Sequence, residues 1–226
     1  MSYFYAWFTL AISALMILII GQYSQIDLLV QDYYYDPISK SFPWKNTWFA
    51  KDLMHTYLKK LLMCLGFLLY TFLIVDFLKP YKKLSQRLRV RLRFVAAASI
   101  LIPLTVSFIK KFSSLHCPWD IDRYNGYAPF LRLMDSIPSG LELGACFPAG
   151  HATTGLWLAS LCVFWMPNKP RKALAVFALG LLLGFIMGWV QQMRGAHFLF
   201  HTLWSMWIAS LIILILLEYF KSNYSH

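Results

Sequence analysis

The sequence predicts an all-α fold: a polytopic membrane protein with a bundle of six transmembrane helices and an extracytoplasmic interfacial segment. Hydrophobic residues make up 59% of the 226 residues and charged residues only 14%, well below the roughly 25% of a soluble domain. The apolar residues gather into six stretches, and basic residues concentrate between some of them. The length suits a single membrane-embedded domain over residues 1–226.

The six apolar stretches are the candidate spans. Several are shorter than the ~20 residues that a span needs, so their helices are expected to extend into the loops, with Pro148 or Ala149 as a start for the fourth. Pro103 should kink the third. The first lacks a basic leader and a small-residue cleavage site, which favours a retained span over a signal peptide. The stretches are Tyr3–Ile20, Leu61–Leu78, Phe94–Ile109, Ala152–Met166, Ala173–Val190 and Phe198–Phe220.

Basic residues predict the orientation in the membrane. The segment 79–93, after the second stretch, holds seven Lys or Arg residues and no acid, and the segment 167–172, after the fourth, holds three and no acid. Short loops rich in Lys and Arg stay in the cytoplasm. Both termini are therefore expected inside, and the loops after the first, third and fifth stretches outside. The net charge of +11 is then a topology determinant, and no nucleic-acid partner is expected.

The first outer segment, Gly21–Lys60, is long and rich in aromatic residues. It contains the run Tyr33–Tyr35 together with Trp44 and Trp48, side chains that are typical of a membrane–water interface. We expect an interfacial amphipathic helix that caps the bundle, rather than a direct role at a substrate site. His55, in the same segment, is expected to be a structural histidine.

Three polar clusters lie where apolar stretches meet the outer loops. They are the segments Lys110–Asp120, Pro148–His151 and Arg194–His197. Ionisable residues at membrane depth are expensive to bury, so they indicate a functional site. Because all three clusters are predicted on one side of the membrane, we expect them to meet in one pocket, whose imidazoles and cations suit a phosphate group.

These residue types can perform phosphoryl chemistry without a metal or another cofactor. The neutral imidazole of His197 can attack phosphorus and carry the phosphoryl group, and His151 can protonate the leaving alkoxide and later activate water. Lys110, Arg194 and the backbone around Gly150 can supply the positive charge and N–H donors that the phosphoryl oxygens need. Anchoring of a helix end at the interface is the alternative role for Lys110 and Arg194.

Together the clusters resemble the signature motifs K-x6-R-P, P-S-G-H and S-R-x5-H-x3-D of the type 2 phosphatidic acid phosphatase superfamily. Six spans with outward-facing motifs are also that family's layout, so the resemblance covers most of the chain. It implies that His197 is the nucleophile, His151 the general acid and base, and Lys110 a phosphate ligand. It also implies substrates such as phosphatidic acid, phosphatidylglycerol phosphate, undecaprenyl diphosphate or phosphorylated lipid A.

The chain departs from these motifs at four positions. Cys117 stands where the family has the arginine of the first motif, and Ala149 replaces the serine of the second. Gln191 and His201 stand at the arginine and aspartate positions of the third motif. We hypothesise that Arg194, about one helical turn after Gln191, supplies the missing guanidinium. Ala149, Gln191 and His201 are still expected to belong to the substrate-binding site.

The partner that orients the nucleophile is left open. His201 can touch His197 across one helical turn, but it is a weaker orienter than a carboxylate. In a second register, His201 is the nucleophile and Ser205 its partner; this register ranks lower, since it puts Gly195 at the arginine position. Three carboxylates of the outer segment that follows the third stretch are further candidates for the orienting role: Asp120, Asp122 and Asp135.

The four cysteines fall into two classes. Cys64 and Cys162 lie inside apolar stretches and are expected to be packing residues. Cys117 and Cys146 lie beside two of the motifs, in the outer segment that follows the third stretch. The outer side of the membrane permits disulfides. We hypothesise a Cys117–Cys146 bond that holds the loop over the pocket. A nucleophilic cysteine is the less favoured alternative, although His116 adjoins Cys117.

The predicted function is that of a membrane lipid phosphatase that hydrolyses a phosphomonoester or diphosphate of a lipid headgroup through a phosphohistidine. The expected location is a bacterial inner membrane with the active site on its outer face, and membrane lipids are the expected partners, with no obligate protein partner. A lipid phosphotransferase and a non-catalytic protein that kept the fold are the alternatives. A transporter is disfavoured because the polar residues gather at one face rather than near the midplane.

Overall fold

Helices make up most of the structure. It is a computed structural model that describes residues 3–220, and these residues contain no β-strand, so the all-α prediction is confirmed. Five helices are long and apolar enough to cross a membrane. The elements are α1 (Phe4–Tyr23), α2 (Ile26–Tyr34), η1 (Pro43–Asn46), η2 (Trp48–Tyr57), α3 (Leu58–Leu78), α4 (Gln86–Lys111), η3 (Pro118–Asp120), η4 (Asp122–Tyr124), α5 (Thr153–Leu156), η5 (Trp157–Trp165), α6 (Pro170–Met193) and α7 (Leu199–Tyr219).

The fourth predicted span differs from the other five. It forms an apolar segment over Thr153–Trp165, made of α5 and the 3₁₀ helix η5, and it is shorter than the ~20 residues of a spanning helix. The helix does not begin at Pro148 or Ala149, because the carbonyl of Ala149 accepts from the hydroxyl of Ser205 (3.0 Å) and the N–H of Thr153 donates to Gly150 (3.2 Å), so no helical bond joins Ala149 to Thr153. A count of six full spans is therefore not confirmed.

The short segment α5–η5 lies at the centre of the bundle. Its Leu156 and Ala159 are fully buried, and they pack in one apolar core with Phe94 and Ile102 of α4 and Ala209 of α7. Burial of these apolar side chains supplies the packing that holds the helices together. The core thus joins α4, α5–η5 and α7. Each of these elements carries predicted site residues or directly follows them in the chain.

Three glycines of α6 let this helix lie close to its neighbours. Gly180, Gly184 and Gly188 follow one another at intervals of four residues, so they share one face of α6. A Cβ atom at Gly180 would lie 2.3 Å from the backbone of Ala159, and one at Gly188 would lie 2.3 Å from Thr202 of α7. Small residues at such spacing are the usual means of close helix approach in membranes, and here they fix α6 against η5 and α7.

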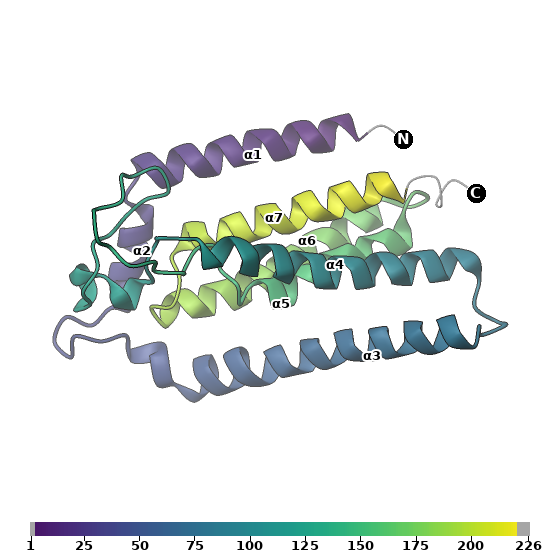
Figure 1. Cartoon of the computed structure of the whole chain (residues 1–226), viewed down its shortest axis with the longest axis horizontal. Coiled ribbons are helices and arrows are strands. Elements are labelled where there is room, and N and C mark those ends of the chain that lie inside the picture. The colour runs from purple at the N-terminus through teal and green to yellow at the C-terminus, as the bar shows by residue number, and fades with distance from the viewer. Residues whose placement is uncertain (1–2, 221–226) are drawn as a thin grey trace.

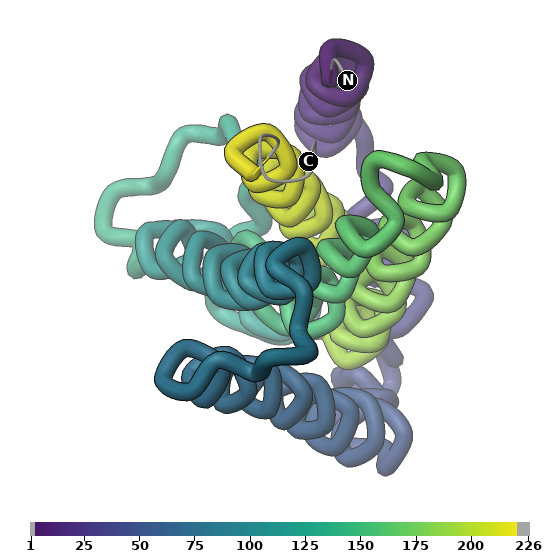
Figure 2. The backbone as a smooth tube through the Cα atoms, turned by 90° about the vertical axis from the view of Figure 1, so that its right-hand side faces the viewer, coloured from purple at the N-terminus to yellow at the C-terminus, as the bar shows by residue number. Residues whose placement is uncertain are grey.

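Helix α1 lies at the edge of the bundle. None of its described residues is buried, and Figure 2 shows it set apart from the other helices, with α7 as its neighbour. Indole N–H groups join the two: Trp7 donates to Glu218 (2.8 Å) and Trp207 donates to the carbonyl of Leu10 (2.9 Å). Lipid-facing apolar residues on the rest of α1 fit its expected role as a span.

The loops gather at opposite ends of the bundle as the basic residues predict. Figure 1 shows the start of α1, the end of α7 and the α3–α4 loop at one end of the bundle, and the segments 24–57, 112–152 and 194–198 at the other. Helix α2 lies at this second end, where buried Gln31 donates to the carbonyl of Gln192 (2.8 Å). It therefore covers this end of the bundle.

Candidate active site

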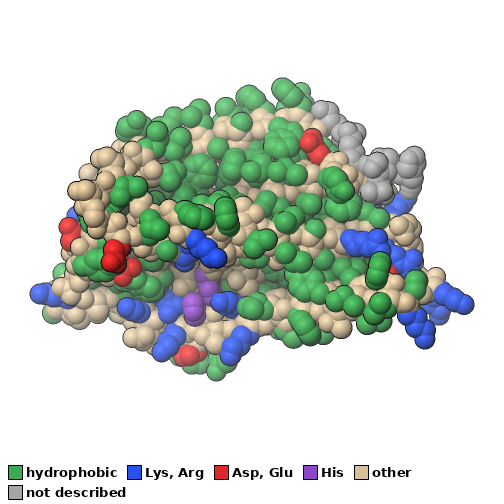
Figure 3. All heavy atoms as spheres, viewed as in Figure 1, with side chains coloured by type: hydrophobic (Ala, Val, Ile, Leu, Met, Phe, Trp, Pro, Cys, Tyr) green, Lys and Arg blue, Asp and Glu red, His purple; other side chains and the backbone are tan. Residues whose placement is uncertain are grey.

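A cavity of about 730 Å³ lies at the loop end of the bundle. It is bounded by η2 and α3 on one side, by α4 and α5 on another, and by the connection between α6 and α7. Figure 3 shows histidine side chains in a hollow of this end, with Lys and Arg side chains around it. No Asp or Glu of residues 3–220 lines the cavity, so its charge is strongly positive.

Six of the predicted site residues line this one cavity. They come from three separate segments, which the fold brings together as the sequence predicts. Lys110 ends α4, the second segment precedes α5, and the third joins α6 to α7. The six are Lys110, Gly150, His151, Gln191, Arg194 and His197.

Two predicted substrate-binding residues, Ala149 and His201, lie behind the cavity rather than in its lining. Ala149 is fully buried, and both of its backbone groups are used: the N–H donates to His201, and the carbonyl accepts from the hydroxyl of Ser205 (3.0 Å). The His201 ring contacts the ring of His197, with centroids 5.9 Å apart. These residues fasten the Pro148–His151 loop to α7.

The same contacts favour His197 over His201 as the nucleophile. The hydroxyl of Ser205 donates to backbone carbonyls of Ala149 and His201, and not to the His201 ring. The His201 ring is buried against Phe147 and Phe198. The second register therefore has neither an orienting partner for His201 nor a place for it in the cavity.

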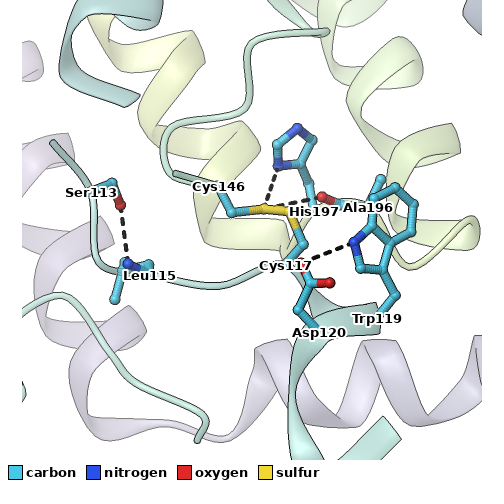
Figure 4. Close-up of a disulfide and its surroundings, with 8 residues drawn as sticks. All are labelled: Ser113, Leu115, Cys117, Trp119, Asp120, Cys146, Ala196 and His197. Carbon is cyan, nitrogen blue, oxygen red and sulfur yellow. Dashed lines mark hydrogen bonds between the residues drawn. A yellow bond between two sulfur atoms is a disulfide. The ribbon is translucent and has the colours of Figure 1, made fainter. Parts of the chain in front are cut away.

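The predicted disulfide is present and lies against the ring of His197. Cys117 and Cys146 are bonded, so the end of the first polar cluster is joined covalently to the loop that leads into the second. The Cys146 sulfur lies 3.4 Å from Nδ1 of His197 and 3.2 Å from the carbonyl oxygen of Ala196. Figure 4 shows the His197 ring with this nitrogen toward the disulfide and the other nitrogen pointing away from it.

Cys146 lies where a partner for the His197 ring is needed. Its sulfur is 3.4 Å from Nδ1 of that ring. A disulfide sulfur carries no hydrogen, so Nδ1 is the donor in that contact. With Nδ1–H held, Nε2 keeps a lone pair for attack on phosphorus.

The three carboxylates considered for this role lie elsewhere. Asp120 accepts from the indole of Trp119 (3.0 Å), and Asp122 accepts from the N–H of Arg123 (2.6 Å). Asp135 accepts from Gln22 and from the N–H of Arg132. The expectation that one of them orients His197 has no support in these contacts.

Metal binding at this point has no ligand set. The side chains of Cys117, Cys146 and His197 are the one group of the described residues that lies close enough together to hold an ion. Because the two sulfurs form the disulfide, they offer no thiolate, which is the form of cysteine that binds metals.

Arg194 lies where a replacement for the missing arginine is needed. It lines the cavity and is 8% exposed. Its guanidinium donates to Gln191 (2.9 Å) and to the carbonyl of Lys45 (3.1 Å). Gln191 occupies the motif position of the arginine, so the two side chains meet at the same point of the cavity wall. Arg194 is therefore held in place beside the phosphate pocket.

Both histidines are neutral at neutral pH. Burial is the largest cause that lowers the pKa of His151 to about 3, followed by the charges of His55, Lys59 and Arg194. Burial also lowers the pKa of His197 well below its ordinary value, followed by the charges of His201 and Lys110. A neutral imidazole is the form that acts as a nucleophile or base.

The lowered pKa of His151 predicts a dependence of stability on pH. The unfolded chain binds a proton at His151 near pH 6.5 and the folded chain only near pH 3, so stability falls as pH drops from about 6.5 toward 3. Replacing His151 by Gln should make thermal unfolding in detergent less sensitive to pH in this window. Equal pH sensitivity of the variant and the wild type would contradict the assignment.

Sequence reasoning missed two residues of the cavity, His55 and Lys59. His55 was expected to be structural, but its ring lies flat against that of His151, with centroids 4.2 Å apart and an interplanar angle of 14°. Both His55 and Lys59 line the cavity. The first outer segment therefore contributes to the site, contrary to the expectation of a purely interfacial role.

A comparison with models of protein families identifies the family of this chain. The family model described as PAP2 superfamily matches residues 91–225. This chain belongs to the PAP2 superfamily. Members of the superfamily are phosphatases, and the five apolar helices indicate a membrane protein. No curated protein and no solved structure matches the chain. The matched region contains all three polar clusters, whereas His55 and Lys59 lie outside it.

Proposed function

We propose that the protein is a membrane lipid phosphatase that hydrolyses a phosphomonoester or diphosphate of a lipid headgroup through a phosphohistidine at His197. One observation carries the proposal: the cavity joins a cationic, histidine-lined end to an arm that runs between two membrane-spanning helices. At the first end lie His151, His197, Lys110 and Arg194. Such a pocket suits a molecule with an anionic headgroup and apolar tails.

The arm of the cavity runs along α3 and α4. Its lining residues there are Leu62, Met63, Gly66, Tyr70, Ser99, Pro103 and Ser107. Helix α4 rises roughly 16 Å between Ser99 and Lys110, at about 1.5 Å per residue. This is about half of a ~30 Å hydrocarbon core. A hydrogen bond between the hydroxyls of Tyr70 and Ser99 (2.7 Å) lies at the inner end. The arm is thus deep enough to receive part of an acyl or prenyl chain.

In the first step, Nε2 of His197 attacks phosphorus and the bond from phosphorus to the lipid oxygen breaks. His151, protonated once the anionic substrate is bound, gives its proton to the leaving oxygen. The phosphoryl oxygens are held by Lys110 and Arg194 and by the N–H groups of the Gly150–His151 loop. Those two N–H groups donate no hydrogen bond within residues 3–220, so they are available to an anion.

In the second step, water attacks the phosphohistidine while neutral His151 accepts its proton, and inorganic phosphate leaves. Release of phosphate returns His197 to its neutral form. The cations act in both steps because negative charge stays on the phosphoryl oxygens throughout. Ala149 and His201 support the pocket from behind, through the backbone bond between them, rather than by contact with the substrate.

The location of the site follows from the loop charges. The basic loops lie at the end of the bundle opposite to the cavity, and such loops stay in the cytoplasm. The cavity then opens toward the outer leaflet, as in a bacterial plasma membrane whose outer-leaflet lipids carry phosphate groups. The disulfide between Cys117 and Cys146 agrees with an oxidising compartment.

Phosphate release from a panel of lipid phosphates tests the proposal. The purified protein in detergent should release inorganic phosphate from at least one long-chain lipid phosphate, and vanadate should inhibit it as a mimic of the transition state. Inorganic phosphate as a product separates hydrolysis from transfer to a second lipid. A complete lack of turnover on monophosphate and diphosphate lipids would favour a non-catalytic protein.

A Gly66→Phe substitution tests the arm. A Cβ atom at Gly66 has no neighbour closer than 3.8 Å, so the change should fold while its ring occupies the arm. We expect KM for a long-chain lipid phosphate to rise about tenfold or more, because the introduced ring displaces the lipid tail from the arm and its apolar contacts there are lost. Turnover of a soluble short-chain phosphate should stay near the wild-type value. Leu68→Phe, on an exposed position of the same helix, is the matched control.

Equal losses on long-chain and short-chain substrates would contradict the arm as the tail site. Equal losses in the Gly66 and Leu68 variants would also contradict it, since the second side chain faces away from the cavity. Thermal unfolding of both variants in the same detergent separates a blocked arm from a damaged fold.

A further inference from the structure

The segment before α3 contains an unusual helix that reaches the active site. Residues Trp48–Tyr57 form a π-helix of ten residues, whereas such helices are rare and are found mostly at functional sites. The side chain of Thr47 caps its start by accepting from the N–H of Ala50. The helix continues directly into α3, and its last turn carries His55 into the wall of the cavity.

This helix contacts His151 through His55. The ring of His55 stacks on the ring of His151, with centroids 4.2 Å apart. One ring nitrogen of each partner, Nδ1 of His55 and Nε2 of His151, is buried without a hydrogen-bond partner. Nε2 of His151 therefore remains available to the substrate.

We infer that His55 is a positioning residue for His151: the stacked ring fixes the plane of the acid–base imidazole and keeps it unprotonated while the site is empty. The inference rests on the proposed function, in which His151 moves protons. It adds a residue outside the three family motifs and outside the matched region 91–225.

The charges around the pair point the same way. Three groups face His151: His55 of η2, Lys59 of α3 and Arg194 at the end of α6. His197 and Lys110 face the same cavity from α7's start and from α4. A proton on His151 would thus meet the positive charges of Lys59, Arg194 and Lys110. A bound phosphate reverses this balance, since its negative charge favours the imidazolium form. Protonation of His151 is then coupled to substrate binding.

Three variants separate stacking from charge and from mere structure. His55→Phe keeps a flat ring against His151 and removes the ionisable group, whereas His55→Ala removes both. Tyr57→Phe changes an exposed side chain of the same π-helix and is the matched control. Histidines carrying ¹³C at Cε1 report each titration by NMR in detergent, and loss of one signal in His151→Gln assigns His151.

The NMR titration does not depend on activity. In His55→Phe, the midpoint of His151 should rise by about one pH unit, while remaining below the ordinary value because burial is retained. In Tyr57→Phe it should stay at the wild-type value. An unchanged His151 midpoint in both His55 variants, with folding intact, would overturn the inference even if the wild type proves to be inactive.

Turnover supplies the second readout. With any lipid phosphate that the wild type hydrolyses, His55→Ala should lower kcat about tenfold with little change in KM, because the ring of His151 loses its fixed orientation. His55→Phe should keep kcat within about threefold. Equal losses of kcat in both variants, with equal losses of thermal stability and no change of the His151 titration, would show that His55 is only structural. Absence of turnover in the wild type would contradict the proposed function alone.

Discussion

Replacing His197 by Ala is expected to abolish phosphate release, by at least about a thousandfold in kcat, because no other nucleophile remains to form the covalent intermediate. His197 is 5% exposed, and its ring lies between the disulfide and the cavity. The measurement is phosphate release from the best lipid of the panel, with folding followed by thermal unfolding in the same detergent.

His116→Gln is the matched control for this prediction. His116 is a buried histidine of the same end of the bundle, but it contacts Tyr127 and does not line the cavity. Its variant should keep turnover within a few-fold of the wild type. Should the His197 variant retain substantial activity while folded, the nucleophile has been assigned to the wrong residue.

Removing the disulfide is the second change with a large expected effect. A double Cys117→Ala, Cys146→Ala variant loses a cross-link across 29 residues, for which loop-closure entropy gives roughly 3 kcal/mol of stability. It also loses the sulfur next to Nδ1 of His197. We therefore expect a lower temperature of unfolding and a kcat about tenfold to a hundredfold lower, since small displacements of a nucleophile are costly.

Cys64→Ala provides the comparison for the cysteine variants. Cys64 is an exposed free thiol on α3 and does not line the cavity, so its loss should change neither stability nor turnover. Mild reductant should reproduce the effect of the double variant on the wild type and on Cys64→Ala. Full activity of the reduced protein would show that the disulfide does not position His197.

Much of the site was predictable because its residues sit in short motifs at the ends of apolar stretches. Lys110, His151, Arg194 and His197 were expected in one pocket from the local sequence and from the charge of the basic loops, and they line one cavity. The pairing of Cys117 with Cys146 was predictable for a related reason, since both adjoin motifs that meet. A short motif was sufficient to predict a residue of the cavity where the residue lies at the end of an apolar stretch.

Contacts between distant segments were not predictable. His55 meets His151 only because a π-helix, with its i→i+5 hydrogen bonds, turns this side chain toward the cavity. No apolar period in the sequence indicates that helix. The fourth helix begins at Thr153 for a similar reason, because the carbonyl of Ala149 accepts from Ser205 of α7 instead of from the N–H of Thr153. The orienting role of Cys146 depends on sulfur contacts that no motif encodes.

The most direct test of the account is to trap the phosphorylated intermediate. With a ³²P-labelled aryl phosphate, whose leaving group departs without a proton, His151→Gln should let His197 attack but should slow hydrolysis by water, so the label should accumulate on the protein after rapid quenching. The account predicts an acid-labile, base-stable label on the peptide that contains His197, and no label in a His151→Gln, His197→Ala double variant. A label on another residue, or label that persists in the double variant, would contradict the account.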